Sequence, residues 1–306
     1  MSFTVTLSAV AVMLLYALPG YLLIKTKLIG QDGIIYFSKL LMYVCQGALV
    51  LYSFGKLEYS PESLINLGIC FAVTLFCMGA IPFFLFLVLK KQREKIVWRL
   101  ICIASVFSNC GFMGVPLLEK LLPDHPEAVA YSCVLSLSMN MVGWSLGLYI
   151  LSLDKKYISP KKILLNPVTI CFLLALPLYF FGLKLPGVID EAVTMLAKLS
   201  APLCMLIMGM RLATVRLKEI FCDLRQYLAV ALNQLAFPLL LWAVFLVLPI
   251  DATMKTTLVI LAACPVASMV QNYAELLGKG QDKAANMVLL GTLLSVGTVP
   301  LICLIL

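Results

Sequence analysis

Two stretches of this sequence place polar and helix-breaking residues inside otherwise apolar segments. The first runs from Asn109 to Pro116 and contains two glycines, Gly111 and Gly114. Proline removes a backbone donor and crowds the preceding helical turn, while glycine lets the backbone open or approach closely. The stretch therefore predicts a broken helix. In a membrane its freed amides and carbonyls must be buried or must line a wet cavity, which places a ligand site here.

The second stretch, 264–272, interrupts another apolar segment with Pro265 and several polar residues. Neither stretch contains paired carboxylates, a nucleophile beside a base or a metal-binding cluster, so hydrogen bonding is expected rather than catalysis. Side-chain amides and helix N-termini can bind an anion without a buried lysine, whose desolvation would be costly. The predicted substrate-binding residues are Asn109, Gly111, Gly114, Pro116, Pro265, Ser268, Gln271 and Asn272.

Some of these polar groups also allow a purely structural interpretation. The amides of Asn109, Gln271 and Asn272 could only cap the broken backbone. Asn140 and the pair Asn233 and Gln234 are secondary candidates, which could face the same site or hydrogen-bond between helices. The alternatives stay open at the level of sequence.

Composition identifies the kind of molecule that positions these stretches. The 306 residues are 62% hydrophobic and 12% charged, with a mean hydropathy of +1.04, which is typical of a polytopic membrane protein. We expect an all-α fold of ten membrane spans, with the fourth and ninth broken and crossing. Their approximate ranges are 3–24, 34–54, 63–89, 97–118, 127–152, 163–182, 189–210, 226–248, 254–276 and 284–305.

Lysine and arginine predict the orientation of these spans. If ten spans alternate, one face collects seventeen basic residues and the other four. The positive-inside rule makes the richer face cytoplasmic, so both termini are expected outside the cytoplasm, in a plasma or inner membrane. The net charge of +8 is thus mainly an orientation signal, and nucleic acid is not an expected partner.

The chain also repeats itself weakly, at offsets of 158, 159 and 155. The matching segments are Ala17-Leu18-Pro19 with Ala175-Leu176-Pro177, Lys39-Leu40 with Lys198-Leu199, and Lys120-Leu121-Leu122 with Glu275-Leu276-Leu277. Five spans per repeat predict two inverted halves, 1–155 and 160–306. The offset of 155 sets Asn109 against Cys264, so the two breaks should cross near the midplane of the membrane.

The whole chain resembles the auxin efflux carrier family, which includes bacterial members implicated in uptake of malonate or other carboxylates. The resemblance is most specific in Asn109-x-x-Phe112-Met113-Gly114-Val115-Pro116. It is supported by the pairs Asn166-Pro167 and Ala201-Pro202, by Gly209, by Pro265 with Ala267, and by the segment from Gly291 to Pro300. The chain departs from plant members at Val270, where they have a second proline, and it lacks their long cytoplasmic loop.

The resemblance implies a fold similar to bile-acid symporters and sodium/proton antiporters. Spans one, two, six and seven would form a scaffold, and spans three to five and eight to ten a mobile transport unit. It also implies a homodimer through spans two and seven, where Gly47, Ala48 and Gly209 are small enough for close approach.

The function expected is secondary transport of a small organic anion, a malonate-like carboxylate, by elevator-type alternating access. The rival classes are an intramembrane enzyme and a lipid scramblase without carrier activity. The only acids near the breaks, Glu119 and Glu275, lie at span ends, so the enzyme class lacks its chemistry. No cofactor or metal is expected, and sodium or proton coupling is compatible with the sequence but not indicated by it.

Overall fold

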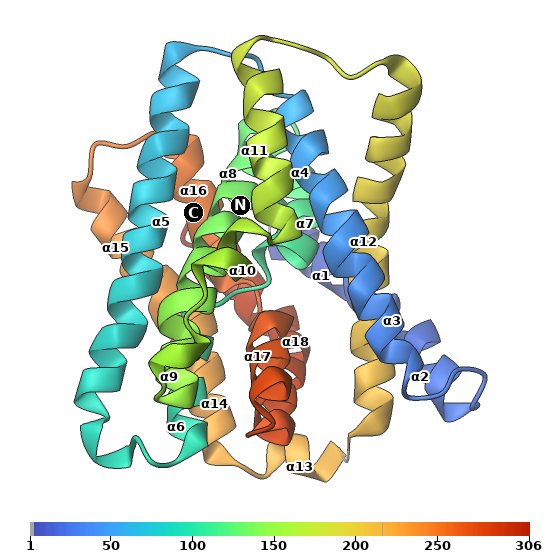
Figure 1. Cartoon of the computed structure of the whole chain (residues 1–306), viewed down its shortest axis with the longest axis vertical. Helices are drawn as coiled ribbons and strands as arrows, with labels where there is room; N and C mark the ends of the chain where they lie inside the picture. Colours follow the sequence, from blue (N-terminus) through green and yellow to red (C-terminus); the bar gives the residue numbers. More distant parts are fainter. Residues whose placement is uncertain (1–2, 216) are drawn as a thin grey trace.

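The computed structural model describes residues 3–215 and 217–306, and in these ranges every regular element is a helix (Figure 1). The first half contains α1 (Phe3–Leu15), α2 (Ala17–Lys25), α3 (Gly33–Leu40), η1 (Leu41–Cys45), α4 (Gln46–Gly55), α5 (Pro61–Val88), η2 (Lys90–Gln92), α6 (Ile96–Ala104), η3 (Cys110–Gly114), α7 (Val115–Leu121), α8 (Pro126–Val142), η4 (Gly143–Gly147) and α9 (Leu148–Ser152). The second half contains η5 (Lys155–Tyr157), α10 (Pro160–Leu164), α11 (Pro167–Phe180), α12 (Gly187–Thr214), α13 (Leu217–Phe221), α14 (Leu224–Ala231), η6 (Leu232–Ala236), α15 (Phe237–Val247), α16 (Ala252–Ala263), α17 (Ser268–Leu277) and α18 (Gln281–Cys303).

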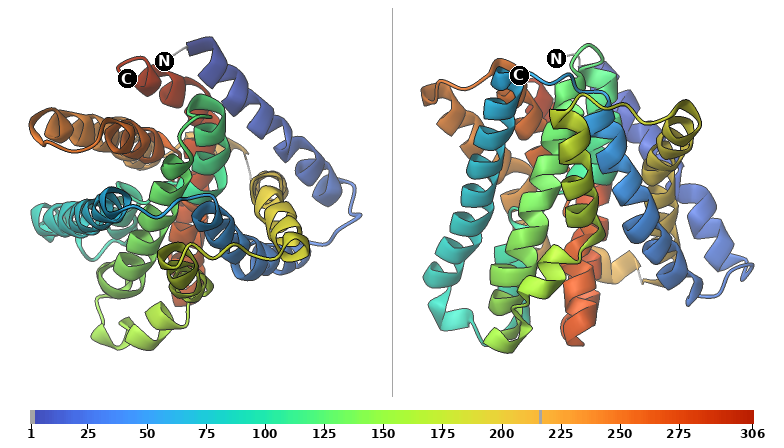
Figure 2. Two further views of the ribbon diagram at one scale, coloured as in Figure 1. Left: turned by 90° about the horizontal axis from the view of Figure 1, so that it is seen from above. Right: turned by 45° about the horizontal axis from the view of Figure 1, so that its top comes forward.

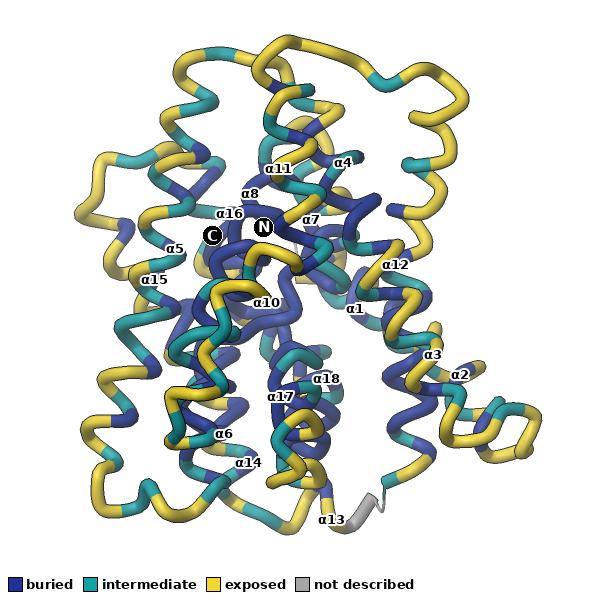
Figure 3. Tube along the Cα trace, in the orientation of Figure 1, coloured by how far each residue is buried: buried dark blue, intermediate teal, exposed yellow. Residues whose placement is uncertain are grey.

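Eight helical stretches of the described chain are long and apolar enough to cross a membrane, compared with the ten spans expected. The two expected spans that are missing from this set, 97–118 and 254–276, are each divided into shorter helices. Apolar side chains on the outward faces of peripheral helices such as α5, α11 and α15 remain exposed, while the centre of the molecule is buried (Figure 3). This pattern is that of a protein whose apolar surface faces lipid.

Several helices begin where the sequence provides a cap. The Ser60 side chain accepts a hydrogen bond from the Ser63 amide at 3.0 Å, and Pro61 occupies the first turn of α5, where its missing donor costs nothing. The Asp251 carboxylate accepts from the Met254 amide at 2.8 Å and starts α16. Both caps lie in short connections at the same end of the molecule (Figure 1).

The first break lies slightly upstream of its predicted position. Helix α6 ends at Ala104, residues 105–109 are not helical, and the stretch from Cys110 is a π-helical turn that leads into α7. Pro116 therefore sits in the first turn of α7 instead of ending a helix. A proline crowds the carbonyl four residues before it, and the wider π-turn is one way to relieve that crowding. The second break, 264–267, falls within its predicted range.

The two breaks cross each other, as predicted. They pair as a short antiparallel bridge, in which the Asn109 amide donates to the Pro265 carbonyl at 2.7 Å and the Ala267 amide donates to the Phe107 carbonyl at 2.8 Å. These reciprocal bonds match 107–109 with 265–267, an offset of 158. The bridge centres on Ser108 and Val266 and sets Asn109 opposite Pro265, while the repeat correspondence of Asn109 with Cys264 stays a prediction.

The helices around the crossing pack in two groups. Helices α2, α4, α11 and α12 pack on one another, while α5, α8 and α18 lie beside the broken pairs α6–α7 and α16–α17. Helix α1 packs mainly against α18, whereas α2 runs along α12, so the first expected span contacts both groups (Figure 2). Both chain ends lie near the same end of the molecule, and the division into inverted halves stays a prediction.

The small residues proposed for a dimer contact are used inside the chain. A methyl group on Gly209 would lie 1.8 Å from the Ala17 carbonyl oxygen, because α2 and α12 cross there with their backbones in contact. Gly47 packs against the side-chain sulfur of Cys171 on α11, and Ala48 is buried. Dimerisation remains a prediction, and these residues do not offer the surface for it.

Candidate substrate site

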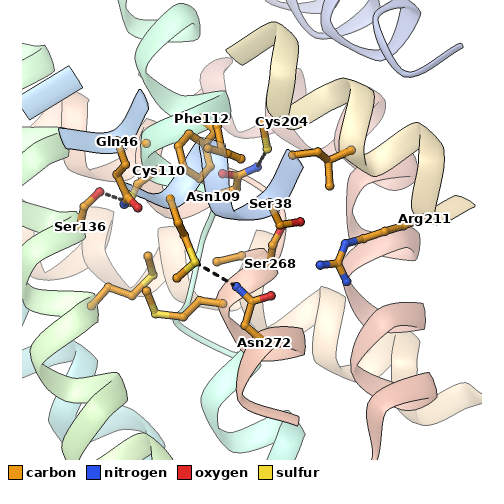
Figure 4. Close-up of a pocket in the computed structure, with 17 residues that line it drawn as sticks. Ser38, Gln46, Asn109, Cys110, Phe112, Ser136, Cys204, Arg211, Ser268 and Asn272 are labelled. Carbon is orange, nitrogen blue, oxygen red and sulfur yellow. Dashed lines mark hydrogen bonds between the residues drawn. The ribbon is translucent and has the colours of Figure 1, made fainter. Parts of the chain in front are cut away.

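A cavity of about 60 Å³ lies where the crossing meets the group formed by α2, α4, α11 and α12. One wall comes from η3 and α17, the helices that begin immediately after the two breaks (Figure 4). The facing wall comes from α3, η1 and α12. The polar residues that line the cavity as a whole are Ser38, Gln46, Asn109, Ser136, Arg211, Ser268 and Asn272.

Three polar side chains in this cavity have donors that meet only a weak acceptor. Each donor faces a sulfur atom: Asn109 Nδ2 lies 3.9 Å from Cys204 Sγ, Ser268 Oγ 4.0 Å from Met208 Sδ, and Asn272 Nδ2 3.9 Å from Met42 Sδ. Sulfur is a weak hydrogen-bond acceptor, so an oxygen atom of a ligand would be a better partner for each. The cavity therefore contains three hydrogen-bond donors whose partners in the structure are weak acceptors.

The backbone adds to this character. Helices η3 and α17 begin at Cys110 and Ser268, and neither has a side-chain cap at its N-terminus. Amides in the first turn of a helix lack partners within the helix and carry its positive dipole end, which favours an anion. The Asn109 side chain does not cap η3, so the structure does not show the backbone-capping role that was the alternative for this amide.

The cavity also contains a buried positive charge. Arg211, near the end of α12, is 7% exposed and directs its guanidinium toward Ser268 and Asn272 (Figure 4). Its Nη1 lies 3.0 Å from Oε1 of Glu275 on α17. Its Nε is buried and, among the described residues, has no hydrogen-bond partner. Glu275 therefore supplies the counter-charge of this buried guanidinium.

A wider basin of about 450 Å³ adjoins this cavity, because Met42 and Gln46 line both. Its other walls include Lys161, Lys162 and Trp144, and the Lys162 ammonium lies 5.1 Å from the centre of the Trp144 ring. Lysines at the start of α10 thus line a wider space that is adjacent to the cavity.

The structure brings together half of the predicted site residues. Asn109, Gly111, Ser268 and Asn272 line the cavity. The other four lie elsewhere: Gly114 packs against Leu261, Pro116 lies on the opposite side of the crossing, Pro265 contributes its carbonyl to the bridge, and Gln271 donates to Glu275 at 2.9 Å.

The secondary candidates are outside the cavity. Asn140 accepts a hydrogen bond from Asn166 at 3.1 Å, which joins α8 to the start of α11. Gln234 donates to the Gly291 carbonyl at 2.7 Å. Asn233 is fully buried, and neither its nitrogen nor its oxygen has a partner in the described chain. For Asn140 and Gln234 the helix-to-helix interpretation fits the geometry.

Arg211 is the site residue that the sequence analysis missed. The expected span ended at residue 210, so Arg211 was counted among the cytoplasmic charges, whereas α12 continues to Thr214. The repeat offset of 159 matches Arg211 with Tyr52, which lies near the end of the second expected span, so the sequence carried no clear signal that Arg211 is buried. Ser38 and Gln46 were also missed, and nothing in their spacing marks them.

A second contact of similar form lies across the crossing. The Tyr52 hydroxyl of α4 donates to Oε1 of Glu119 on α7 at 2.8 Å, and it accepts a hydrogen bond from Lys56. A small cavity of about 70 Å³ beside it is lined by Gly111, Pro116 and Lys198, among others. Gly111 lines this cavity as well as the first one, so the two spaces lie on either side of one helical turn.

Broken helices that cross in an apolar helical protein, beside a small cavity rich in donors, are the arrangement expected of a membrane transporter. A sequence model of the family described as membrane transport protein matches residues 5–160 and 155–303. The chain therefore belongs to this family of transporters, which confirms the resemblance to auxin efflux carriers. No curated protein matches the chain.

Proposed function

We propose that the protein is a secondary transporter of a small organic anion, a carboxylate of malonate-like size. The observation that carries this proposal is the set of donors at the crossing, Asn109, Ser268 and Asn272, which meet sulfur atoms in place of oxygen. A carboxylate oxygen accepts hydrogen bonds much better than sulfur, and binding there requires no desolvated lysine. Arg211 supplies the opposite charge.

The size of the cavity favours a small substrate. One water needs about 10–15 Å³ of such volume, so a cavity of about 60 Å³ has room for about four to six waters, comparable with the seven non-hydrogen atoms of malonate. A substrate as large as an indole acid would need the walls to separate.

The transport step that fits this arrangement is alternating access of the elevator type. The cavity lies between two groups of helices, so sliding one group past the other would carry a bound anion from one side to the other. Helices α5, α8 and α14–α18, with the broken α6 and α7, would form the moving unit. Helices α2, α3, α4, α11 and α12 would form the scaffold.

The experiment is binding and uptake of malonate by purified protein, compared between the wild type and Asn109→Ala. Loss of a hydrogen bond to a charged ligand should weaken binding by about 1.5–3 kcal/mol. The matched control is Asn140→Ala, which removes a buried amide that faces Asn166 and not the cavity. It should lower thermal stability without changing affinity, and wild-type affinity in Asn109→Ala would reject the site.

A further inference from the structure

The ion pair between Arg211 and Glu275 joins the two sides of the cavity. Arg211 comes from α12 and Glu275 from α17, so the contact connects the proposed scaffold to the proposed moving unit. Arg211 lines the cavity and Glu275 does not, so the ion pair connects α12 to α17 at the edge of the cavity. A movement of α17 relative to α12 must break this contact.

The two partners differ in side-chain exposure, and therefore in the energetic cost of losing the ion pair. The Arg211 side chain is 9% exposed, whereas that of Glu275 is 44% exposed. A buried guanidinium left without a counter-charge is strongly unfavourable, but a half-exposed carboxylate can turn into water at little cost. Glu275 can therefore leave, provided that another anion replaces it at Arg211.

Unused hydrogen-bonding groups near Arg211 point to the same conclusion. Its Nε is buried and has no hydrogen-bond partner in the described chain. The Oγ of Ser38, a residue that lines the same cavity, is also buried without a partner there. A guanidinium has a fork of donors that matches both oxygens of one carboxylate. With Glu275 on Nη1, the Nε donor of that fork stays without a partner in the described chain.

We propose that Glu275 occupies Arg211 in place of the substrate, and that the carboxylate of the substrate displaces it. Arg211 is then the residue that selects a carboxylate, and the exchange releases α17 from α12 only when an anion is bound. The released Glu275 keeps its hydrogen bond from Gln271 Nε2, which lies 2.9 Å away on the same helix. This inference rests on the proposed function, since it names how that site recognises its ligand.

The test is the direction of the affinity change when each partner is altered in the full-length protein, with malonate as the probe. Glu275→Gln removes the competing charge and should tighten malonate binding by roughly three- to tenfold, because the competent form of Arg211 becomes more populated. Arg211→Gln should weaken it by about tenfold or more. A purely structural ion pair would instead give a loss of affinity, or none, in both variants.

The matched control is Glu119→Gln, which neutralises the carboxylate on the opposite side of the crossing. It should leave malonate affinity unchanged. If Arg211→Gln does not fold, Glu275→Gln decides alone: tighter binding supports the exchange, and unchanged or weaker binding overturns it.

The same measurements separate this inference from the proposed function. If Asn109→Ala weakens malonate binding while both Arg211→Gln and Glu275→Gln retain wild-type affinity, the carrier site stands and the exchange is overturned. If the wild-type protein binds neither malonate nor acetate in a thermal-shift titration, both proposals fail together.

Discussion

The two carboxylate contacts on either side of the crossing have the same form but different chemistry. Tyr52 and Arg211 are 159 residues apart, so they would occupy equivalent places in the two halves if the predicted repeat holds at that offset. Each donates from a long, continuous helical stretch to a glutamate on the helix that follows a break, Glu119 or Glu275. One side therefore holds its glutamate with a neutral phenol and the other with a permanent cation.

This difference indicates which side is suited to anions. A buried phenol that loses its acceptor leaves one unsatisfied donor, whereas a buried guanidinium leaves an uncompensated charge. Only the second requires a new anion when its glutamate moves away. At the first contact Lys56 donates to the tyrosine. Lys56 is exposed, so water and dissolved ions can stabilise its charge. An anion is therefore needed at Arg211, and the donors of the cavity gather on the same side.

The largest effect should come from making the two contacts alike. Arg211→Tyr keeps a donor that can reach Glu275 but removes the charge, so malonate binding should fall by about tenfold to a hundredfold. Isothermal titration of the purified variant measures this change, and a size-exclusion profile checks that it folds. Malonate affinity within threefold of the wild type would show that the charge at this position does not contribute to malonate binding.

A smaller effect is expected on the side of Tyr52. Glu119→Gln replaces a charged acceptor by a neutral one, so the contact between α4 and α7 should lose about 1 kcal/mol of stability. The measurement is thermal unfolding in detergent, in parallel with malonate uptake. A loss of malonate affinity as large as that of Arg211→Tyr would contradict the contrast between the two sides.

The breaks were predictable from sequence because they depend on local chemistry. Proline, glycine and amides within an apolar run have few uses other than opening the backbone, and both predicted breaks are present. The register of the first break was wrong by several residues, because a π-turn absorbs Pro116 and moves the opening to 105–109. Propensity alone does not distinguish a π-turn from a break.

The side chains that line the cavity were harder to predict. Gln271 and Asn272 are neighbours on α17, and consecutive helical residues point about 100° apart, so only one of them faces the cavity. Which one depends on how α17 rotates against α12, a property of packing that no local pattern contains. Arg211 was missed for a related reason, since the expected span ended at residue 210 while α12 continues to Thr214 with Arg211 buried.

The smallest effect should come from a third carboxylate, which does not bridge the two groups. Asp223 lies in the connection before α14, where its oxygens accept from Arg225 Nε at 2.8 Å and from Lys283 Nζ at 3.1 Å. The hydrogen bond from Arg225, with a further one from Lys283, lowers the pKa of Asp223 to about 2. Since α14 and α18 belong to the same proposed moving unit, this cluster should hold together throughout transport.

Asp223→Asn should therefore change stability slightly and transport not at all. A carboxyl whose pKa is depressed by folding stabilises the protein above its unfolded pKa of about 3.9, and that contribution is lost as the pH falls through about 2. At pH 7 the variant should be less stable by about 0.2–1 kcal/mol, because both basic partners are more than two-fifths exposed. Thermal unfolding at pH 7 and pH 3 should show the difference shrinking at the lower pH. Malonate uptake that fell as much with Asp223→Asn as it should with Arg211→Tyr would contradict this expectation. It would mean that Glu119 and Glu275, which join the proposed scaffold to the proposed moving unit, matter no more for transport than a carboxylate inside one unit.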